Sequence, residues 1–162
     1  MKTLFLVRHA KSSWNDPALP DKDRPLNDRG ERDARRLGKR LAKRDVKPDV
    51  IVSSPARRAL ATAGIIARKL GFRVRDIQMS DRLYAVEAAD LLQVIRGLGD
   101  EVKSAMLVGH NPELTELAQR LSDEIAYMPT CAVAEFRFDA RSWSRAGKDK
   151  PARAMLYTPR TS

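Results

Sequence analysis

The sequence predicts an α/β fold, a three-layer α/β/α sandwich with helices on both faces of a mostly parallel central sheet. Two short apolar runs, 4–7 and 105–108, have the composition of strands buried on both faces, as in a parallel sheet. Strand-like and helix-like segments then alternate along the chain, which is the order typical of such a sheet. Because we find no internal repeat, linker or low-complexity tract, we expect one domain over 1–162.

Composition is typical of a folded globular protein. The 162 residues are 43% hydrophobic and 32% charged, which provides for one buried core. A single cysteine excludes an internal disulfide framework, and two histidines with one cysteine are too few for a structural zinc site. The N-terminal apolar run is too short for a secretory signal, and no stretch approaches the ~20 apolar residues of a membrane helix. We therefore expect a cytoplasmic protein without membrane contact, and no cofactor or metal.

The first strand ends at Arg8, and the segment 11–25 that follows has the prolines and aspartates of a loop. A helix is expected to begin after Asn27, a residue suited to capping a helix N-terminus. Ala34, Leu37 and Leu41 fall at helical spacing and form its buried stripe. Its other faces carry eight cations: Arg29, Arg32, Arg35, Arg36, Lys39, Arg40, Lys43 and Arg44.

The rest of the chain continues the alternation of strands and helices. We expect strands over 49–53, 74–79, 105–110, 132–138 and 153–158, and helices over 56–70, 88–98 and 112–121. Gly71 and Gly99 follow the first two of these helices, and Asn111 is the expected cap of the third. The strand over 132–138 alternates apolar and polar residues, which predicts one buried and one solvated face.

Both histidines of the chain, His9 and His110, directly follow apolar strands. Arg8 precedes the first histidine, and Arg57 and Arg58 stand at the start of the helix after the strand 49–53. Because parallel strand ends converge at one sheet edge, we expect a pocket with two imidazoles, at least two guanidiniums and a helix N-terminus. Guanidiniums and free backbone N–H groups bind phosphate oxygens, and an imidazole placed there can attack phosphorus. Packing alone is the alternative for any one such histidine.

Four segments in order resemble the motifs of the histidine phosphatase superfamily, which includes the phosphoglycerate mutases. Segment 8–15 resembles its Arg-His-Gly motif, 26–30 its Leu-Thr-x-x-Gly helix start, 54–62 its Ser-x-x-x-Arg-Ala-x-x-Thr segment, and 108–110 its second-histidine motif. Order and spacing agree from Thr3 to about Leu121. The short chain and the Ser-Pro-x-x-Arg-Ala form point to the SixA-like phosphohistidine phosphatases, which implies a phosphoglycerate mutase-like fold.

The resemblance also implies roles for particular residues. His9 would be the nucleophile that accepts the phosphoryl group, while Arg8, Arg58 and His110 would hold that group. Arg58 is preferred to its neighbour because it occupies the family's Arg-Ala position. The further substrate-binding candidates are Asn15, which matches a polar position near the phosphate in the mutases, Ser12, and Arg57 as a rim contact.

Two departures from the family pattern bear on the reaction. Ala10 replaces the usual Gly after the nucleophile and restricts the backbone there. Ala85 stands where many members have a Glu that acts as general acid toward an alcohol leaving group. SixA-like members similarly lack this acid, and the labile P–N bond of a phosphorylated imidazole needs less help to break. Glu87 could substitute as the acid, although a carboxylate in the first turn of a helix is also ordinary.

The segment from Cys131 to Arg137 has the Cys-x5-Arg spacing of cysteine phosphatases. That chemistry needs a tight loop of amides around the phosphate and a thiol of lowered pKa. The segment has no glycine and alternates as a strand, and Glu135 would repel phosphate. We therefore interpret the spacing as part of a strand.

We expect a metal-independent phosphatase with a phosphohistidine intermediate on His9, acting on phosphohistidine of a signalling protein. The alternative within this mechanism is a phosphatase for a small phosphomonoester. A different class is a basic nucleic-acid-binding module, since the net charge is +10, but recognition motifs and interleaved aromatics are missing. We expect a monomer whose partner is a phosphorylated protein or small substrate. If the basic helix docks an acidic protein, Arg35, Arg36 and Arg40 changed to Glu should raise only the KM for that protein.

Overall fold

The structure, a computed structural model, describes residues 1–160. Its centre is a six-stranded sheet in the order β3-β2-β4-β1-β5-β6. The strands are β1 (Lys2–Arg8), β2 (Val50–Ser53), β3 (Gln78–Met79), β4 (Ser104–Gly109), β5 (Val133–Phe138) and β6 (Arg153–Tyr157). The strands β3, β2, β4 and β1 are parallel, whereas β5 pairs antiparallel with both β1 and β6. The expected α/β class and mostly parallel sheet are confirmed.

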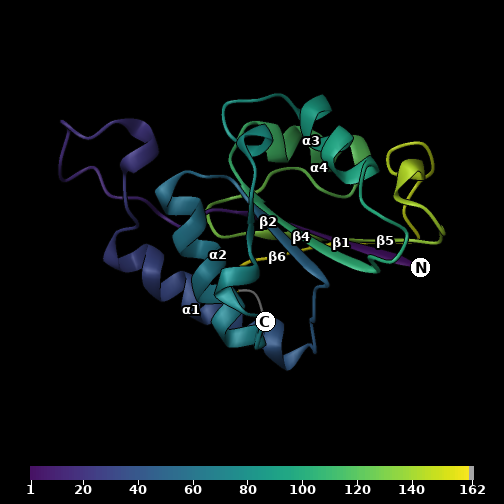
Figure 1. Cartoon of the computed structure of the whole chain (residues 1–162), viewed down its shortest axis with the longest axis horizontal. Helices are drawn as coiled ribbons and strands as arrows, with labels where there is room; N and C mark the ends of the chain where they lie inside the picture. Colours follow the sequence, from purple (N-terminus) through teal and green to yellow (C-terminus); the bar gives the residue numbers. More distant parts are fainter. Residues whose placement is uncertain (161–162) are drawn as a thin grey trace.

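Helices cover both faces of the sheet (Figure 1). They are α1 (Asp28–Lys43), α2 (Arg57–Leu70), α3 (Ala88–Arg96) and α4 (Glu113–Leu121). Leu4 and Leu6 of β1 belong to the apolar core shared with α3 and α4, whereas Phe5 and Val7 belong to the core shared with α1 and α2. Because successive side chains of β1 enter opposite cores, the strand had to be apolar throughout, as its sequence is.

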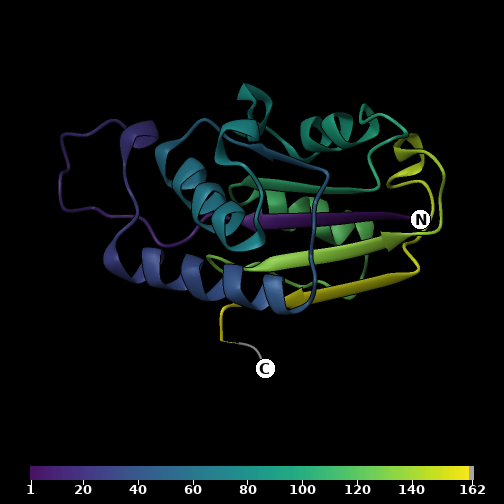
Figure 2. The same cartoon turned by 60° about the horizontal axis from the view of Figure 1, so that its bottom comes forward.

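The segment between β1 and α1 extends past the end of the sheet, where it includes a short 3₁₀ turn over Asp21–Asp23 (Figure 2). The helix α1 begins where predicted, because the Asn27 side chain accepts a hydrogen bond from the Gly30 backbone N–H at 2.8 Å. Gly30 also lets the chain pass closely, since a Cβ there would lie 2.1 Å from the Lys11 carbonyl oxygen. The helix start thereby holds the segment that follows His9.

Four expectations from the sequence differ in detail from the structure. The strand predicted over 74–79 is only Gln78–Met79, because Val74–Asp76 forms a 3₁₀ turn at an exposed sheet edge. The helix α3 ends at Arg96 rather than near residue 98, and α4 begins after Pro112, although the Asn111 side chain still accepts from the Thr115 N–H. The strand β5 is covered on both faces, so Glu135 is buried and not solvated.

Buried Glu135 has two partners that explain how a carboxylate is accommodated there. The Tyr157 hydroxyl donates a hydrogen bond to its Oε1 at 2.9 Å, and Arg137 Nε donates to its Oε2 at 3.0 Å. No helix within residues 1–160 has the length and apolar character needed to span a bilayer.

Candidate functional site

The two histidines meet because they follow neighbouring parallel strands in the same register. Arg8 of β1 lies opposite Gly109 of β4, and the His9 N–H donates to the Gly109 carbonyl oxygen at 3.0 Å. One residue further on, the rings of His9 and His110 lie with their centroids 5.1 Å apart and their planes at 54°. Both side chains are buried, so the sequence prediction that these histidines share one sheet edge agrees with the structure.

A pocket of about 340 Å³, here called the strand-end pocket, opens at this edge. It is lined by Arg8, His9, Lys11, Ser12, Trp14, Arg24, Arg58, His110, Asn111 and Thr130. Four of these residues are Lys or Arg, and none is Asp or Glu. The pocket therefore favours an anionic ligand.

The two predicted arginines are held by the protein through their outer nitrogens. Arg8 Nη1 donates to the Tyr127 hydroxyl at 3.0 Å and to the Met128 carbonyl at 3.1 Å. Arg58 donates from Nη1 to the Asp21 carbonyl at 2.7 Å and from Nη2 to the Asp21 carboxylate at 2.9 Å. These bonds fix the guanidiniums in place without using every N–H group.

Three buried side-chain nitrogens within residues 1–160 have no hydrogen-bond partner, and all three belong to residues that line the strand-end pocket. They are Arg8 Nε, Arg58 Nε and His110 Nδ1. An unsatisfied buried donor costs roughly 1–3 kcal/mol, so three in one pocket need a functional explanation. An oxyanion with several acceptor oxygens would satisfy them together.

Both imidazoles are neutral at pH 7. Burial, followed by the charges of nearby arginines, lowers the pKa of His9 to about 4. Burial, the neighbouring His9 and Arg58 lower the pKa of His110 to about 3. A neutral imidazole keeps a lone pair on one ring nitrogen, as a nucleophile requires.

Hydrogen bonds assign the proton on each ring. His9 Nδ1 lies 2.7 Å from the Ala10 carbonyl oxygen, which can only accept, so Nδ1 carries the proton and Nε2 the lone pair. His110 Nε2 lies 2.8 Å from Ser54 Oγ, which already accepts from the Ala56 N–H. Among the hydrogen bonds of the described residues the Ser54 hydroxyl has no other acceptor, so it donates to Nε2, and His110 carries its proton on the unpartnered Nδ1. The pocket thus combines one lone pair with three N–H donors.

Two residues of the 11–25 segment belong to the site although the sequence did not single them out. Arg24 is buried, lines the pocket, donates to Ser12 Oγ at 2.7 Å and stacks on Trp14. The Asp21 carboxylate accepts from Arg58, from Arg24 and from the Tyr84 hydroxyl, which lies 2.7 Å away. The bond from Tyr84, together with those from the arginines, holds the pKa of Asp21 well below its usual range. No periodicity marks such residues in a loop.

The substrate-binding candidates separate into one that lines the pocket and two that do not. Ser12 lines the pocket and accepts the hydrogen bond from Arg24. Asn15 is exposed and absent from the lining, so the structure does not bring it to the pocket. Arg57 is exposed and also outside the lining, whereas Arg58 is 6% exposed. Successive residues of a helix point in different directions, which separates the two arginines.

Ala10, Ala85 and Glu87 belong to the positions where the sequence departs from the family pattern, and the structure shows the surroundings of each. Ala10 is fully buried and is not among the non-glycine residues with positive φ, so Ala fits there without strain. Ala85 has φ of 55° and lines a hollow beside Tyr84 and His110. Glu87 caps α3 in a reciprocal pair of hydrogen bonds with Asp90 and does not line the strand-end pocket. Glu87 therefore stabilises the start of α3.

Cys131 does not have the properties of a nucleophile. Its side chain is buried, and burial raises the pKa of the thiol to about 12. Arg137, which completes the Cys-x5-Arg spacing, pairs with Glu135. The interpretation of this segment as a strand agrees with the structure, in which β5 begins at Val133.

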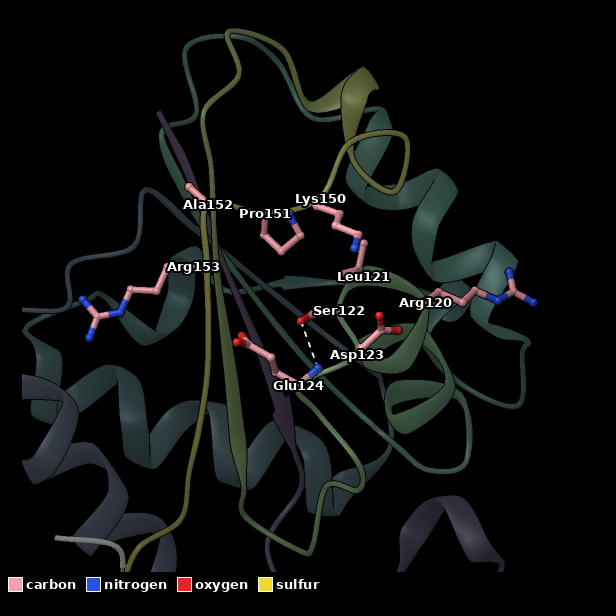
Figure 3. Close-up of a pocket in the computed structure, with 9 residues that line it drawn as sticks. All are labelled: Arg120, Leu121, Ser122, Asp123, Glu124, Lys150, Pro151, Ala152 and Arg153. Atoms are coloured by element: carbon pink, nitrogen blue, oxygen red, sulfur yellow. Dashed lines mark hydrogen bonds between the residues drawn. The ribbon is translucent and has the colours of Figure 1, made fainter.

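A second hollow, of about 290 Å³, lies between residues 120–124 at the end of α4 and residues 150–153 at the start of β6 (Figure 3). Its charged lining side chains, including Arg120, Asp123 and Lys150, are exposed. The hydrogen bond drawn within it joins the Glu124 N–H to Ser122 Oγ. It contains no histidine and none of the three unpartnered nitrogens, so it does not compete with the strand-end pocket.

Comparison with known proteins agrees with this geometry. A model of the histidine phosphatase superfamily (branch 1) matches residues 4–91. An uncharacterized chloroplastic protein of Arabidopsis thaliana is 31% identical over 153 residues, which cover 90% of this chain and 70% of that protein. The crystal structure of SixA from Agrobacterium tumefaciens is similar with a TM-score of 0.80 and 30% identity, covering 95% of this chain and 97% of the other. The structure of the protein histidine phosphatase SixA complexed with tungstate shares the fold, with a TM-score of 0.82, 22% identity and 97% coverage of both chains.

Proposed function

The chain belongs to the histidine phosphatase superfamily and is SixA-like, and from this premise we propose that it is a metal-independent phosphatase for phosphohistidine on another protein. We infer that 1–162 acts as one catalytic domain, because the pocket draws on residues as far apart as Arg8 and Thr130. In this proposal His9 is the nucleophile, and Arg8, Arg58 and His110 bind the phosphoryl oxygens.

The observation that carries the proposal is that three residues with an unpartnered side-chain nitrogen, Arg8, Arg58 and His110, line the same pocket as His9. Arg8 Nε, Arg58 Nε and His110 Nδ1 can each donate to a phosphoryl oxygen, and fixed donors stabilise the charge that develops there during transfer. His9 Nε2 is then free to attack phosphorus in line with the leaving group. The four cationic side chains of the lining supply the positive charge that a metal supplies in other phosphoryl-transfer sites.

The reaction has two balanced steps. In the first, a bond forms between His9 Nε2 and phosphorus while the bond from phosphorus to the substrate imidazole breaks. That imidazole carries a proton on its other ring nitrogen, so it takes the electron pair and leaves as a neutral molecule. In the second, a water molecule attacks phosphorus, the bond to His9 breaks, and inorganic phosphate and the neutral histidine are released. The Ala10 carbonyl holds Nδ1–H throughout and so orients the ring.

The absence of Asp and Glu from the lining of the strand-end pocket supports phosphohistidine over an alcohol ester. Ala85 occupies the position of the acid, Glu87 is bound as a helix cap, and the strand-end pocket has no carboxylate in its lining. Asp21 lies nearby, but its lowered pKa keeps it ionised at neutral pH. A leaving alkoxide needs protonation, whereas an imidazole is a much better leaving group.

The test is turnover of a histidine-phosphorylated protein and of p-nitrophenyl phosphate, with and without EDTA. We expect EDTA-insensitive release of phosphate, a higher kcat/KM for the phosphohistidine protein, and loss of both activities in His9→Ala. A higher kcat/KM for the ester would favour the small-phosphomonoester alternative. Residual turnover above about 1% in His9→Ala would exclude His9 as the nucleophile, because its removal should cost several orders of magnitude. Salt-sensitive nucleic-acid binding without turnover would favour the binding module.

A further inference from the structure

Two exposed aromatic rings stand beside the strand-end pocket. The large hydrophobic side chains that residues 1–160 expose are Met1, Trp14, Val74, Met79 and Tyr127. Trp14 is 72% exposed and Tyr127 is 55% exposed. Single exposed apolar residues need no explanation, but Trp and Tyr are the residues enriched at the centres of protein interfaces. Both of these rings contact arginines that line one pocket.

Trp14 is fixed against the pocket and also open to solvent. The Arg24 guanidinium lies 3.6 Å from the centre of its ring, within the range of a cation–π contact. Arg24 is itself buried and held by Ser12 and Asp21, so the ring rests on a rigid support. Its large exposed fraction leaves area for contact with a partner, and a prepositioned ring loses little entropy on binding.

Tyr127 reaches the same pocket from another part of the chain. It lies between α4 and β5, and β5 is antiparallel to β1, so this segment arrives at the edge where β1 ends. Its hydroxyl accepts from Arg8 Nη1 at 3.0 Å, and Arg8 Cζ lies 6.0 Å from the ring centroid. The two rings therefore contact two different arginines of one anion-binding pocket.

Exposed cations stand in the segments that form the pocket, together with the exposed carboxylates of Asp16, Asp21 and Asp23. Lys11, Lys22 and Arg57 are exposed, and each is adjacent in sequence to a residue that forms or anchors the site: Ala10, Asp21 and Arg58. Lys22 Nζ also lies 5.6 Å from the ring of Tyr84, which bonds to Asp21. The pocket that the rings border has four Lys or Arg side chains and no Asp or Glu in its lining, so a partner that lies across the rings meets positive charge, which an acidic surface complements.

Building on the proposed function, we propose that Trp14 and Tyr127, together with Lys11, Lys22 and Arg57, form a docking rim for the protein that carries the phosphorylated side chain. The partner is an acidic segment with an apolar residue next to the phosphohistidine: the apolar residue contacts the rings, and the carboxylates face the three cations. A small phosphorylated molecule fills the strand-end pocket and does not reach Tyr127, Lys22 and Arg57, which are absent from the lining of that pocket. The rim thus determines substrate specificity while the pocket performs the reaction.

The test compares substrates that share the P–N bond and differ beyond it. Phosphoramidate has the bond and no side chain. Two synthetic phosphohistidine peptides carry either Leu and Glu or Gly and Lys as neighbours of the phosphohistidine. We expect the wild type to have at least a fivefold lower KM for the acidic peptide than for the basic one, with a difference that shrinks as salt is added.

Because Trp14 also lines the strand-end pocket, the readout is the difference between the two substrates: Trp14→Ala should raise the KM for the acidic peptide at least fivefold more than it raises the KM for phosphoramidate. Trp14→Phe should restore part of the peptide affinity, and Val74→Ala, which removes an exposed side chain outside the pocket lining, should change neither substrate. Tyr127→Phe keeps the ring but loses the hydrogen bond to Arg8, whereas Tyr127→Ala loses both. The KM for the acidic peptide should therefore be higher in Tyr127→Ala than in Tyr127→Phe, and the difference measures the contribution of the ring.

Three results would overturn the docking rim while leaving the phosphatase intact: equal losses on phosphoramidate and peptide in Trp14→Ala, no loss on either, or no preference for the acidic peptide. Turnover of neither phosphoramidate nor peptide by the wild type would overturn the proposed function itself, and the rim with it. The two failures are therefore distinguishable.

Discussion

Lowering the pH from 7 to 4.5 should destabilise the protein through its two histidines. Both are neutral in the folded protein, with the pKa of His9 lowered to about 4 and that of His110 to about 3, mainly by burial. In the unfolded chain a histidine has a pKa of about 6.5 and becomes charged over this range. The unfolded state therefore binds more protons, and stability that is fully present above pH 6.5 is lost as the pH falls toward the folded pKa values.

The size of the loss follows from these pKa values. At pH 4.5 the unfolded histidine is about 99% protonated, whereas most of the folded molecules keep both rings neutral. Each ring then lowers the free energy of unfolding by roughly 2.5 kcal/mol, or about 5 kcal/mol for the pair. A loss of this size is comparable with the whole stability of many domains, which is about 5–15 kcal/mol.

Urea denaturation at pH 7.0 and 4.5 measures this loss, with His9→Asn, His110→Asn and the double variant as controls. Asn is neutral at both pH values, so each single variant should lose about half as much stability as the wild type, and the double variant the least. Carboxylates remain the same in all four proteins and cancel in the comparison, and Asp21 titrates below this range because its pKa is lowered. Equal losses in the wild type and the double variant would show that the imidazoles are not buried as neutral groups, and would refute the reasoning.

Three further substitutions test individual contacts. Arg58→Ala should weaken competitive inhibition by inorganic phosphate on the order of 10- to 100-fold, since a hydrogen bond to a charged group contributes ~1.5–3 kcal/mol. Arg57 is exposed, so Arg57→Ala should change this inhibition less than twofold. Equal effects of the two substitutions would show that Arg58 does not bind the phosphate. Ser54→Ala removes the hydroxyl that fixes the His110 proton on Nδ1, so ¹⁵N NMR should show a larger population of the Nε2–H tautomer of His110. An unchanged tautomer population would show that Ser54 does not set the position of this proton. Glu87→Gln should leave kcat on phosphohistidine within twofold because this side chain caps α3, whereas a tenfold fall would identify it as the general acid.

The sequence predicted those parts of the site that depend on regular structure. His9 and His110 follow apolar runs that could be recognised as parallel strands, and parallel strands bring their carboxyl ends to one edge. Asn27 marked the start of α1 because capping depends on a few neighbouring residues only. Arg57 and Arg58 could not be separated by pattern alone, and the family resemblance favoured the one that the structure places in the pocket lining.

The contacts made by the loop between β1 and α1 could not be predicted in this way. Asp21 joins the site through bonds to Arg58 of α2 and to Tyr84, which are distant in sequence, and no local periodicity indicates such contacts. Arg24 is held in turn by Asp21 and by Ser12 of the same loop. Asn15 lies in the same loop and has the expected residue type, yet it stays exposed. The burial of Glu135 was missed for a similar reason, since its partner Tyr157 belongs to a strand that pairs across a long connection.

The most direct test of the central claim, that the phosphoryl group passes through His9, is to locate it on the protein during turnover. Enzyme mixed with phosphoramidate, quenched within milliseconds and kept alkaline to preserve the P–N bond, can be digested and sequenced by mass spectrometry. We expect one phosphoryl group on the peptide that contains His9, and none on that peptide from His9→Ala. A phosphoryl group on any other residue, or phosphate release at the wild-type rate by His9→Ala, would contradict the account.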